Sequence, residues 1–222
     1  MRSFDEIFAM AAERKGGADA LNAMLEPPLG ASDLAAIPDD RWLAQSTKCI
    51  FNAGFNWKVV DAMWPGFEDA FRGFDLGQCA MLNDEDIARL ASDTRIVRHG
   101  SKIRSVQENA VFFGDLAKEH GSVGNFVAGW PDTDYAGLLA LLKKRGSRLG
   151  GNTGQYFLRF MGKDSYVLSR DVIARLIAEG VIDKEPSSKA AMAAVQSAFN
   201  TWREQSGRSM KETSRTLAMS IG

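Results

Sequence analysis

The chain has few cysteines and histidines and no long hydrophobic run. Its 222 residues include 2 Cys and 2 His, and these four residues are widely spaced with no CxxC pair. This spacing argues against a Cys/His zinc site and is typical of a protein from a reducing cytoplasm. No apolar run approaches the roughly 18 residues of a membrane span, and the amphipathic N-terminus carries acids early, unlike a secretory signal. We therefore predict no metal, no cofactor, no membrane contact and a cytoplasmic location.

A strong net charge is also absent, because the formal charge is −1. The middle of the chain nevertheless differs from the rest. Between Arg95 and Arg170 twelve Lys or Arg face six Asp or Glu, so this segment carries +6 and the remainder −7. A basic segment of this kind is typical of a surface that faces a polyanion, but solvated helix faces give the same count.

Strand-type alternation is scarce, and the helical period dominates. From Ile103 onward, apolar residues recur every three or four positions, which predicts an inward-facing helical stripe; they are Ile103, Val106, Ala110, Phe113 and Ala117. Capping residues predict the starts of further helices: Asn83, Ser101, Ser122, Asp132 or Thr133, and Ser209. We expect Pro27-Pro28, Pro65-Gly66 and Pro131 to separate helices. The pattern predicts an all-α protein of about ten helices with a two-lobed core.

Residues 148–160, RLGGNTGQYFLRF, place a glycine cluster between two predicted helices. The first helix ends near Gly146 with three basic residues in its last turn, a turn follows over Leu149–Thr153, and the second helix runs through Tyr156 and Phe160. In a helix-hairpin-helix module, the exposed N–H groups of such a hairpin can hold a DNA phosphate. A plain loop is the alternative, and the flanking cations favour the phosphate. The predicted DNA contacts are Lys102, Lys143, Lys144, Arg145, Arg148, Gly150, Gly151, Asn152, Thr153 and Gly154.

A second set of motifs points to a family. Residues 53–74, AGFNWKVVDAMWPGFEDAFRGF, contain Ala53-Gly54-x-x-Trp57, and Ile96-x-Arg98-His99-x-x-Lys102-Ile103 follows. Over about residues 40–175 this ordered string resembles the DNA-3-methyladenine glycosylase I family of the helix-hairpin-helix glycosylases. The resemblance implies a two-lobed helical DNA glycosylase fold, with the helix-hairpin-helix near 138–162. It also implies a glycosylase-like domain over 41–222, preceded by a helical extension over 1–40.

The resemblance implies hydrolysis of the N-glycosidic bond of an alkylated purine, such as 3-methyladenine, after the nucleotide is flipped out of double-stranded DNA. A monomer acting on DNA in a bacterial nucleoid is the corresponding expectation. Phe55 falls at the family's intercalating position, and Trp57 matches the tryptophan of its base pocket, whose π face suits a cationic purine. Either side chain could instead belong to the core. Asn52 and Asn56 are further pocket candidates, since their amides can pair with a base edge.

The chain departs from the family at its zinc ligands and at its pocket glutamate. The C-terminal region lacks the zinc ligands, and the glutamate aligns with Cys49, with no acid beside it. Asp171 lies where the wider superfamily carries an aspartate that stabilises the sugar cation. Alternatively, Asp171 only favours the helix dipole behind Ser169. A non-catalytic helix-hairpin-helix protein that binds DNA therefore stays open beside the glycosylase.

Overall fold

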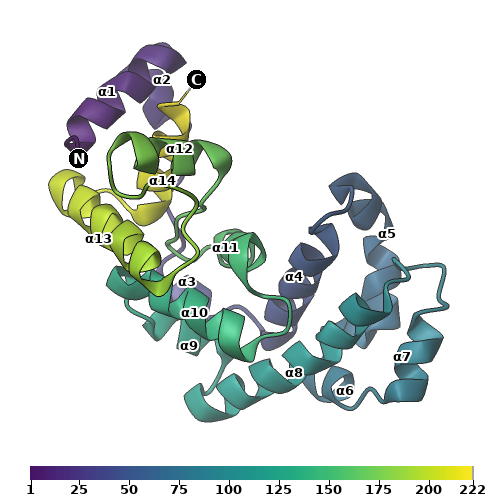
Figure 1. Ribbon diagram of the computed structural model, residues 1–222. Coiled ribbons are helices and arrows are strands. Elements are labelled where there is room, and N and C mark those ends of the chain that lie inside the picture. The colour runs from purple at the N-terminus through teal and green to yellow at the C-terminus, as the bar shows by residue number, and fades with distance from the viewer. Residues whose placement is uncertain (222) are drawn as a thin grey trace. The chain divides into compact units, whose positions relative to one another are not determined.

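The computed structural model describes residues 1–221, and helices are the only regular elements in this range (Figure 1). The all-α prediction is confirmed, although the helices are shorter and more numerous than the ten expected. Residue 222, the end of the predicted glycosylase-like domain, lies outside the described residues. The elements are α1 (Phe4–Lys15), α2 (Ala18–Asn22), α3 (Ala31–Ala35), α4 (Asp39–Asn52), α5 (Trp57–Ala70), η1 (Arg72–Phe74), α6 (Leu76–Ala80), α7 (Asp84–Leu90), α8 (Gly100–His120), α9 (Val123–Gly129), η2 (Asp132–Asp134), α10 (Tyr135–Arg145), α11 (Gly151–Phe160), α12 (Arg170–Ala178), α13 (Lys189–Ser206) and α14 (Met210–Met219).

The chain divides into two compact units, as the two-lobed prediction requires. Unit 1 comprises Met1–Leu29, Pro131–Leu138 and Gly162–Gly222, and unit 2 comprises Gly30–Trp130 and Leu139–Met161. Residues 1–29 therefore share a unit with the C-terminal helices, while residues 30–40 belong to unit 2. The separate extension over 1–40 stays a prediction.

Unit 1 contains α1, α2, α12, α13 and α14 (Figure 1), and aromatic side chains form part of its core. Tyr166 stacks on Phe199 with ring centroids 4.6 Å apart, and Tyr135 meets Tyr166 edge-on at 4.8 Å. All three rings are fully buried. Residues distant in sequence thus share one core.

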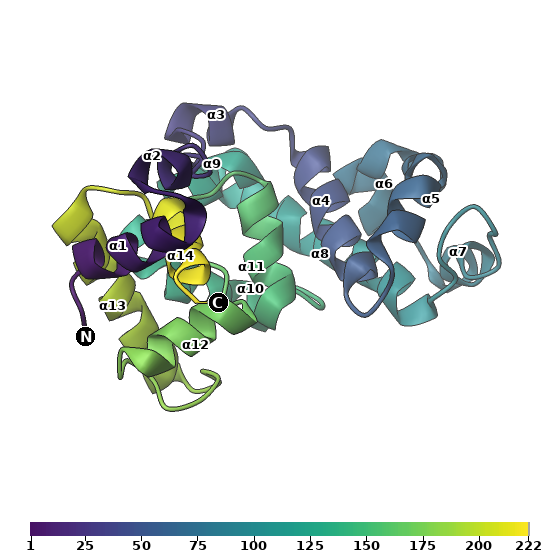
Figure 2. The same ribbon diagram turned by 90° about the horizontal axis from the view of Figure 1, so that it is seen from above.

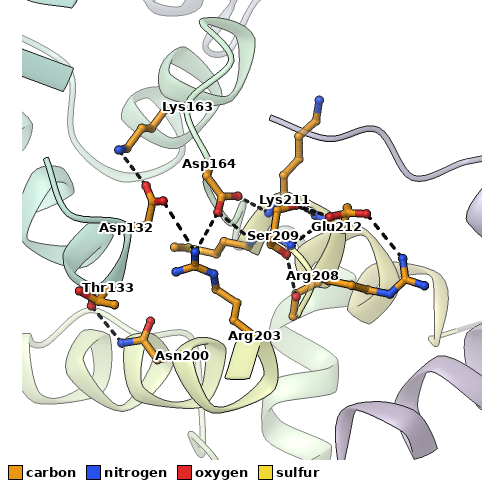
Figure 3. A network of polar contacts seen from close by, with 12 residues as sticks. Asp132, Thr133, Lys163, Asp164, Asn200, Arg203, Arg208, Ser209, Lys211 and Glu212 are labelled. Carbon is orange, nitrogen blue, oxygen red and sulfur yellow. Dashed lines mark hydrogen bonds and ion pairs between the residues drawn. The ribbon is translucent and has the colours of Figure 1, made fainter. Parts of the chain in front are cut away.

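A network of charged side chains joins four segments of unit 1 (Figure 3). The buried Asp164 carboxylate accepts from the backbone N–H groups of Met210, at 3.0 Å, and Lys211, at 2.8 Å, at the start of α14. Arg203 of α13 lies 3.4 Å from Asp164 and 3.7 Å from Asp132. The network therefore ties the segment after α11 to α13, to α14 and to η2.

Unit 2 is organised around α4 and α8 (Figure 2). The predicted stripe of α8 is buried at Ile103, Val106, Ala110 and Phe113, so the inward-facing assignment is confirmed there. On α4, Trp42 meets Phe157 of α11 edge-on, with centroids 5.9 Å apart. This packing attaches the second helix of the glycine hairpin to the core of unit 2.

Several predicted helix boundaries are confirmed and others are wrong. Asn83, Ser122 and Ser209 are N-caps whose side chains accept from the first turn. The long helix starts at Gly100 after His99 instead of after Ser101, and α10 starts at Tyr135 after a short 3₁₀ turn.

Pro65 was expected to separate helices but lies inside α5. A proline inside a helix costs one backbone hydrogen bond. Complete burial of Val60 and Phe67 on the same helix offsets that loss. Tertiary packing here overrides the local signal.

Candidate nucleic-acid interface

The turn between α4 and α5 presents two aromatic side chains to solvent. Gly54 adopts a left-handed backbone with φ +72°, and the Asn56 side chain caps α5 by accepting from the Lys58 N–H at 3.0 Å. Phe55 is 46% exposed and Trp57 is 44% exposed. The alternative that either residue belongs to the core is therefore wrong. Because its oxygen caps the helix, the Asn56 side chain is already engaged.

Trp57 is held by two rings of α11. Its indole lies 5.9 Å, centroid to centroid, from both Tyr156 and Phe160, and both contacts are edge-on. Tyr156 and Phe160 stack at 5.8 Å. Neither residue was among the predicted site residues, although their i, i+4 spacing on one helix is visible in the sequence.

Near its C-terminal end, α4 has a cysteine and not a carboxylate at position 49. Cys49 is buried, its sulfur accepts from Gln45 Nε2 at 3.5 Å, and burial raises the pKa of its thiol to about 11. A neutral thiol thus stands where the resemblance placed a glutamate. Asn52 is also buried, and its Oδ1 has no hydrogen-bond partner among the described residues. An orphaned amide oxygen in a buried place is able to accept from an incoming donor.

Lys102 is buried beside the same turn. Its ammonium donates to the backbone carbonyls of Ala53, at 2.8 Å, and Phe51, at 3.2 Å. Burial, and secondarily the charge of Arg148, lower the pKa of this lysine. The geometry gives Lys102 a C-capping role at the end of α4, where carbonyls lack helical partners. Its contact with a DNA phosphate stays a prediction.

The glycine hairpin joins α10 to α11, but its turn lies earlier than predicted. The turn spans residues 146–150, and α11 begins at Gly151, so the predicted turn over Leu149–Thr153 is wrong. No side chain caps α11. Gly151 has φ +58°, and no atom lies within 4 Å of the place that a Cβ would occupy. The first turn of α11 is therefore open to a ligand of the N–H groups.

Close backbone packing at Gly154 and hydrogen bonds at Ser147 fix the shape of the hairpin. Gly154 is buried, and a Cβ there would lie 2.4 Å from the Leu149 carbonyl oxygen, so a close backbone approach requires this glycine. Asn109 of α8 fixes the turn, because its side chain accepts from the Ser147 N–H at 2.8 Å and donates to the Ser147 carbonyl at 3.0 Å.

A cavity of about 350 Å³ opens between the hairpin and the end of α4. Its lining residues are Ile50, Ala53, Lys102, Arg148, Gly150 and Thr153. Two cations and no carboxylate line this cavity. Arg148 has a left-handed backbone with φ +58°, and its guanidinium donates to Ser101 Oγ at 2.7 Å. The arrangement favours an anionic group.

The basic residues before the hairpin differ in their partners. Lys143 and Lys144 are exposed, and no ion pair joins them to the part of the chain that the structure describes. Arg145 lies 3.4 Å from Asp115 and 4.0 Å from Glu119. The two lysines are consequently better placed to meet a phosphate than Arg145 is. Asn152 is exposed in the first turn of α11 instead of in the predicted turn, and its contact with DNA stays a prediction.

Asp171 lies in unit 1, whereas all the residues described above in this section lie in unit 2. It is exposed in the first turn of α12, behind Ser169, whose hydroxyl accepts from the Val172 N–H at 3.3 Å. An acid in this position favours the helix dipole. Its catalytic role stays a prediction.

No group of three or more His, Cys, Asp or Glu side chains within residues 1–221 could hold a metal ion. Over the same described residues, no helix is both long and apolar enough to cross a membrane.

The chain is similar in sequence to methyladenine glycosylases. The methyladenine glycosylase family model matches residues 47–137. DNA-3-methyladenine glycosylase 1 of Escherichia coli (strain K12) is 28% identical over 120 residues, which cover 46% of this chain and 64% of that protein. The match thus spans slightly less than two thirds of the relative's length.

Solved structures share the fold. The 3-methyladenine DNA glycosylase I of Staphylococcus aureus matches with a TM-score of 0.51 and 22% identity, over 62% of this chain and 80% of that one. The Methanocaldococcus jannaschii 8-oxoguanine glycosylase/lyase, solved with DNA, matches with a TM-score of 0.50 and 13% identity over 96% and 95% of the two chains.

The fold is thus the helical fold of these solved structures. In sequence, the chain is similar to the methyladenine glycosylase family over residues 47–137.

Proposed function

We propose that the chain is a DNA N-glycosylase that removes alkylated purines, such as 3-methyladenine, from double-stranded DNA. The observation that carries the proposal is the exposure of Phe55 and Trp57 on one short turn, in the same compact unit as the open hairpin. An exposed phenylalanine can fill the place of a flipped nucleotide, and an exposed indole can stack on the flipped base. The relative named above is itself a DNA-3-methyladenine glycosylase.

Phosphate binding at the hairpin would position the duplex. The N–H groups at the start of α11 and the cations Lys143, Lys144 and Arg148 are the contacts we propose. Such contacts fix the register of a protein on DNA and carry no sequence information. A monomer acting on chromosomal DNA in the cytoplasm is part of the same proposal.

The reaction requires no strong acid in the pocket. An adenine methylated at N3 is cationic while it is bound to the sugar, so it leaves as neutral 3-methyladenine with the electron pair of the bond. Water then adds to C1′ of the sugar and loses a proton. The oxocarbenium-like transition state needs a nearby negative field. Asp171 is the group we propose for this purpose.

A second candidate function is DNA binding without catalysis. The neutral thiol of Cys49 favours it, because a buried, protonated sulfur supplies neither charge nor a strong acceptor to a cationic base. The two candidates make the same phosphate contacts, so binding alone does not separate them.

The deciding experiment is incubation of the wild-type protein with methylated duplex DNA, with released bases measured by chromatography and abasic sites by alkaline cleavage. The glycosylase predicts release of 3-methyladenine at a rate that Asp171→Asn reduces. Binding of the duplex without release of any methylated base would leave the non-catalytic candidate. Gly151→Asp is the variant for the hairpin: the added charge should weaken duplex binding in both cases.

A further inference from the structure

Three aromatic side chains of unit 2 form an exposed cluster, and the sequence motifs single out only one of them, Trp57. Trp57 comes from the start of α5, and Tyr156 and Phe160 come from α11. Phe160 is 49% exposed and Trp57 is 44% exposed, while Tyr156 is partly buried between them. We call these three residues the aromatic platform.

The platform is ordered by its own contacts. Each ring touches the other two, with centroid separations of 5.8–5.9 Å. Single exposed apolar residues are ordinary on protein surfaces, but a contiguous aromatic cluster is typical of an interaction site. Because its rings hold one another, the platform loses little side-chain freedom when a flat ligand stacks on it.

The surroundings of the platform favour nucleic acid as the occupant. Tyr156 and Phe160 lie on the helix that begins at the open hairpin, five and nine residues after Gly151. At a rise of 1.5 Å per residue this is about 7–14 Å along the helix axis. Lys143 and Lys144 precede the same hairpin and lack ion-pair partners among the described residues. A strand whose phosphate lies at the hairpin thus has bases within reach of the platform.

We propose that Tyr156 and Phe160 are base-binding residues, which with Trp57 form a stacking surface for an unpaired purine. The proposal rests on the proposed DNA binding and extends it to two residues of the hairpin helix. Stacking is tolerant of base identity, because every base has a π face. The platform therefore contributes to the recognition of an unstacked base, whereas the hairpin contributes to the backbone contact.

The test measures binding rather than base release. Affinity is measured at one salt concentration for a duplex with a single bulged adenine and for the same duplex fully paired. Wild type should prefer the bulged duplex. Phe160→Leu should lower affinity for the bulged duplex by about ten-fold, from the loss of one aromatic stacking surface, and should leave the fully paired duplex unchanged. Phe160→Trp should keep the preference, because it restores an aromatic face.

Two further variants make the test decisive. Tyr156→Leu repeats it one helical turn earlier, should Phe160→Leu fail to fold. Val111→Ala removes another exposed apolar side chain of unit 2, 44% exposed on α8, and should change neither affinity. Equal losses on both duplexes, unchanged affinity in both Leu variants, or a wild type without preference for the bulge would each overturn the proposal. Because no base is released in this assay, a wild-type protein that prefers the bulge but excises nothing refutes only the glycosylase.

Discussion

Lys102 places a positive charge inside unit 2, where its ammonium donates to two backbone carbonyls. From the sequence this lysine was expected to meet a DNA phosphate, because it lies in a basic segment. The structure instead puts it against the end of α4, directly before the turn that carries Phe55 and Trp57. Sequence spacing could not reveal this contact, since Lys102 and Ala53 are 49 residues apart. A buried cation at a helix C-terminus stabilises the carbonyls that lack helical partners.

We therefore expect Lys102→Met to lower the free energy of unfolding. The methionine keeps most of the volume but leaves the Phe51 and Ala53 carbonyls without their donor, which costs about 1.5–3 kcal/mol for hydrogen bonds to a charged group. Lys143→Met, at an exposed position, should stay within about 0.5 kcal/mol of wild type. Urea unfolding at neutral pH checks both. Equal stability of the two variants would show that the Lys102 cap does not contribute to the free energy of unfolding.

The buried thiol of Cys49 makes the free energy of unfolding depend on pH within a definite window. The unfolded thiol ionises near 9, and the buried native thiol has a pKa of about 11. The native state therefore keeps its proton through this window, so the contribution of Cys49 to stability is complete below pH 9 and is lost as the pH rises toward 11.

Between pH 8 and pH 10 wild type should lose roughly 1 kcal/mol more stability than Cys49→Ala, which lacks the titrating group. Urea unfolding at the two pH values measures this difference. At pH 8 iodoacetamide should leave native Cys49 unmodified and should react with it only in the unfolded chain. Rapid modification of the native protein would contradict the buried thiol.

At the scale of elements, the sequence predicted helix type well and helix ends less well. Serine and asparagine caps at Asn83, Ser122 and Ser209 were recognisable, because capping needs only residues three positions apart. The hairpin turn was misplaced because a glycine cluster reads as loop, whereas Gly151 and Gly154 here lie inside α11. Gly151 adopts a left-handed φ, whereas Gly154 allows close packing against the backbone. Only the folded structure shows which glycine has which role.

Substitution of two helical glycines, Gly154 and Gly114, distinguishes a glycine required by close packing from one that is not. Gly154→Ala should destabilise the protein by about 1–3 kcal/mol, because the new Cβ would lie 2.4 Å from the Leu149 carbonyl and the backbone must shift. Gly114→Ala in α8 meets no atom within 4 Å and should stabilise the protein by up to about 1 kcal/mol through helix propensity. Thermal unfolding of the two variants gives the sign of each change. A stabilising Gly154→Ala would refute the close approach at the hairpin.

At the scale of the whole molecule, the sequence predicts the fold class but not which distant segments pack together. An all-α chain with two compact units was predictable from periodicity and from the family motifs. The grouping of residues 1–29 with the C-terminal helices was not, because it depends on contacts between segments more than a hundred residues apart. Arg2 and Glu179 illustrate this, because their side chains form an ion pair at 2.8 Å between the first and the last segment of unit 1. Likewise, exposure of Phe55 and Trp57 follows from the folded turn, while their sequence neighbours allowed a core position equally well.

Asp164 provides the last prediction, because it connects three segments of unit 1 through one buried carboxylate (Figure 3). Asp164→Ala leaves the Met210 and Lys211 N–H groups without their acceptor and Arg203 without one of its two carboxylates. Breaking a buried charged contact of this kind should lower the free energy of unfolding by about 2–4 kcal/mol. Asp183→Ala, at an exposed position, is the matched control and should remain within about 0.5 kcal/mol of wild type. Since every partner of Asp164 named here belongs to unit 1, amide hydrogen exchange should rise first at the start of α14. A uniform rise over both units, or a loss no larger than that of Asp183→Ala, would show that apolar packing alone holds these segments together.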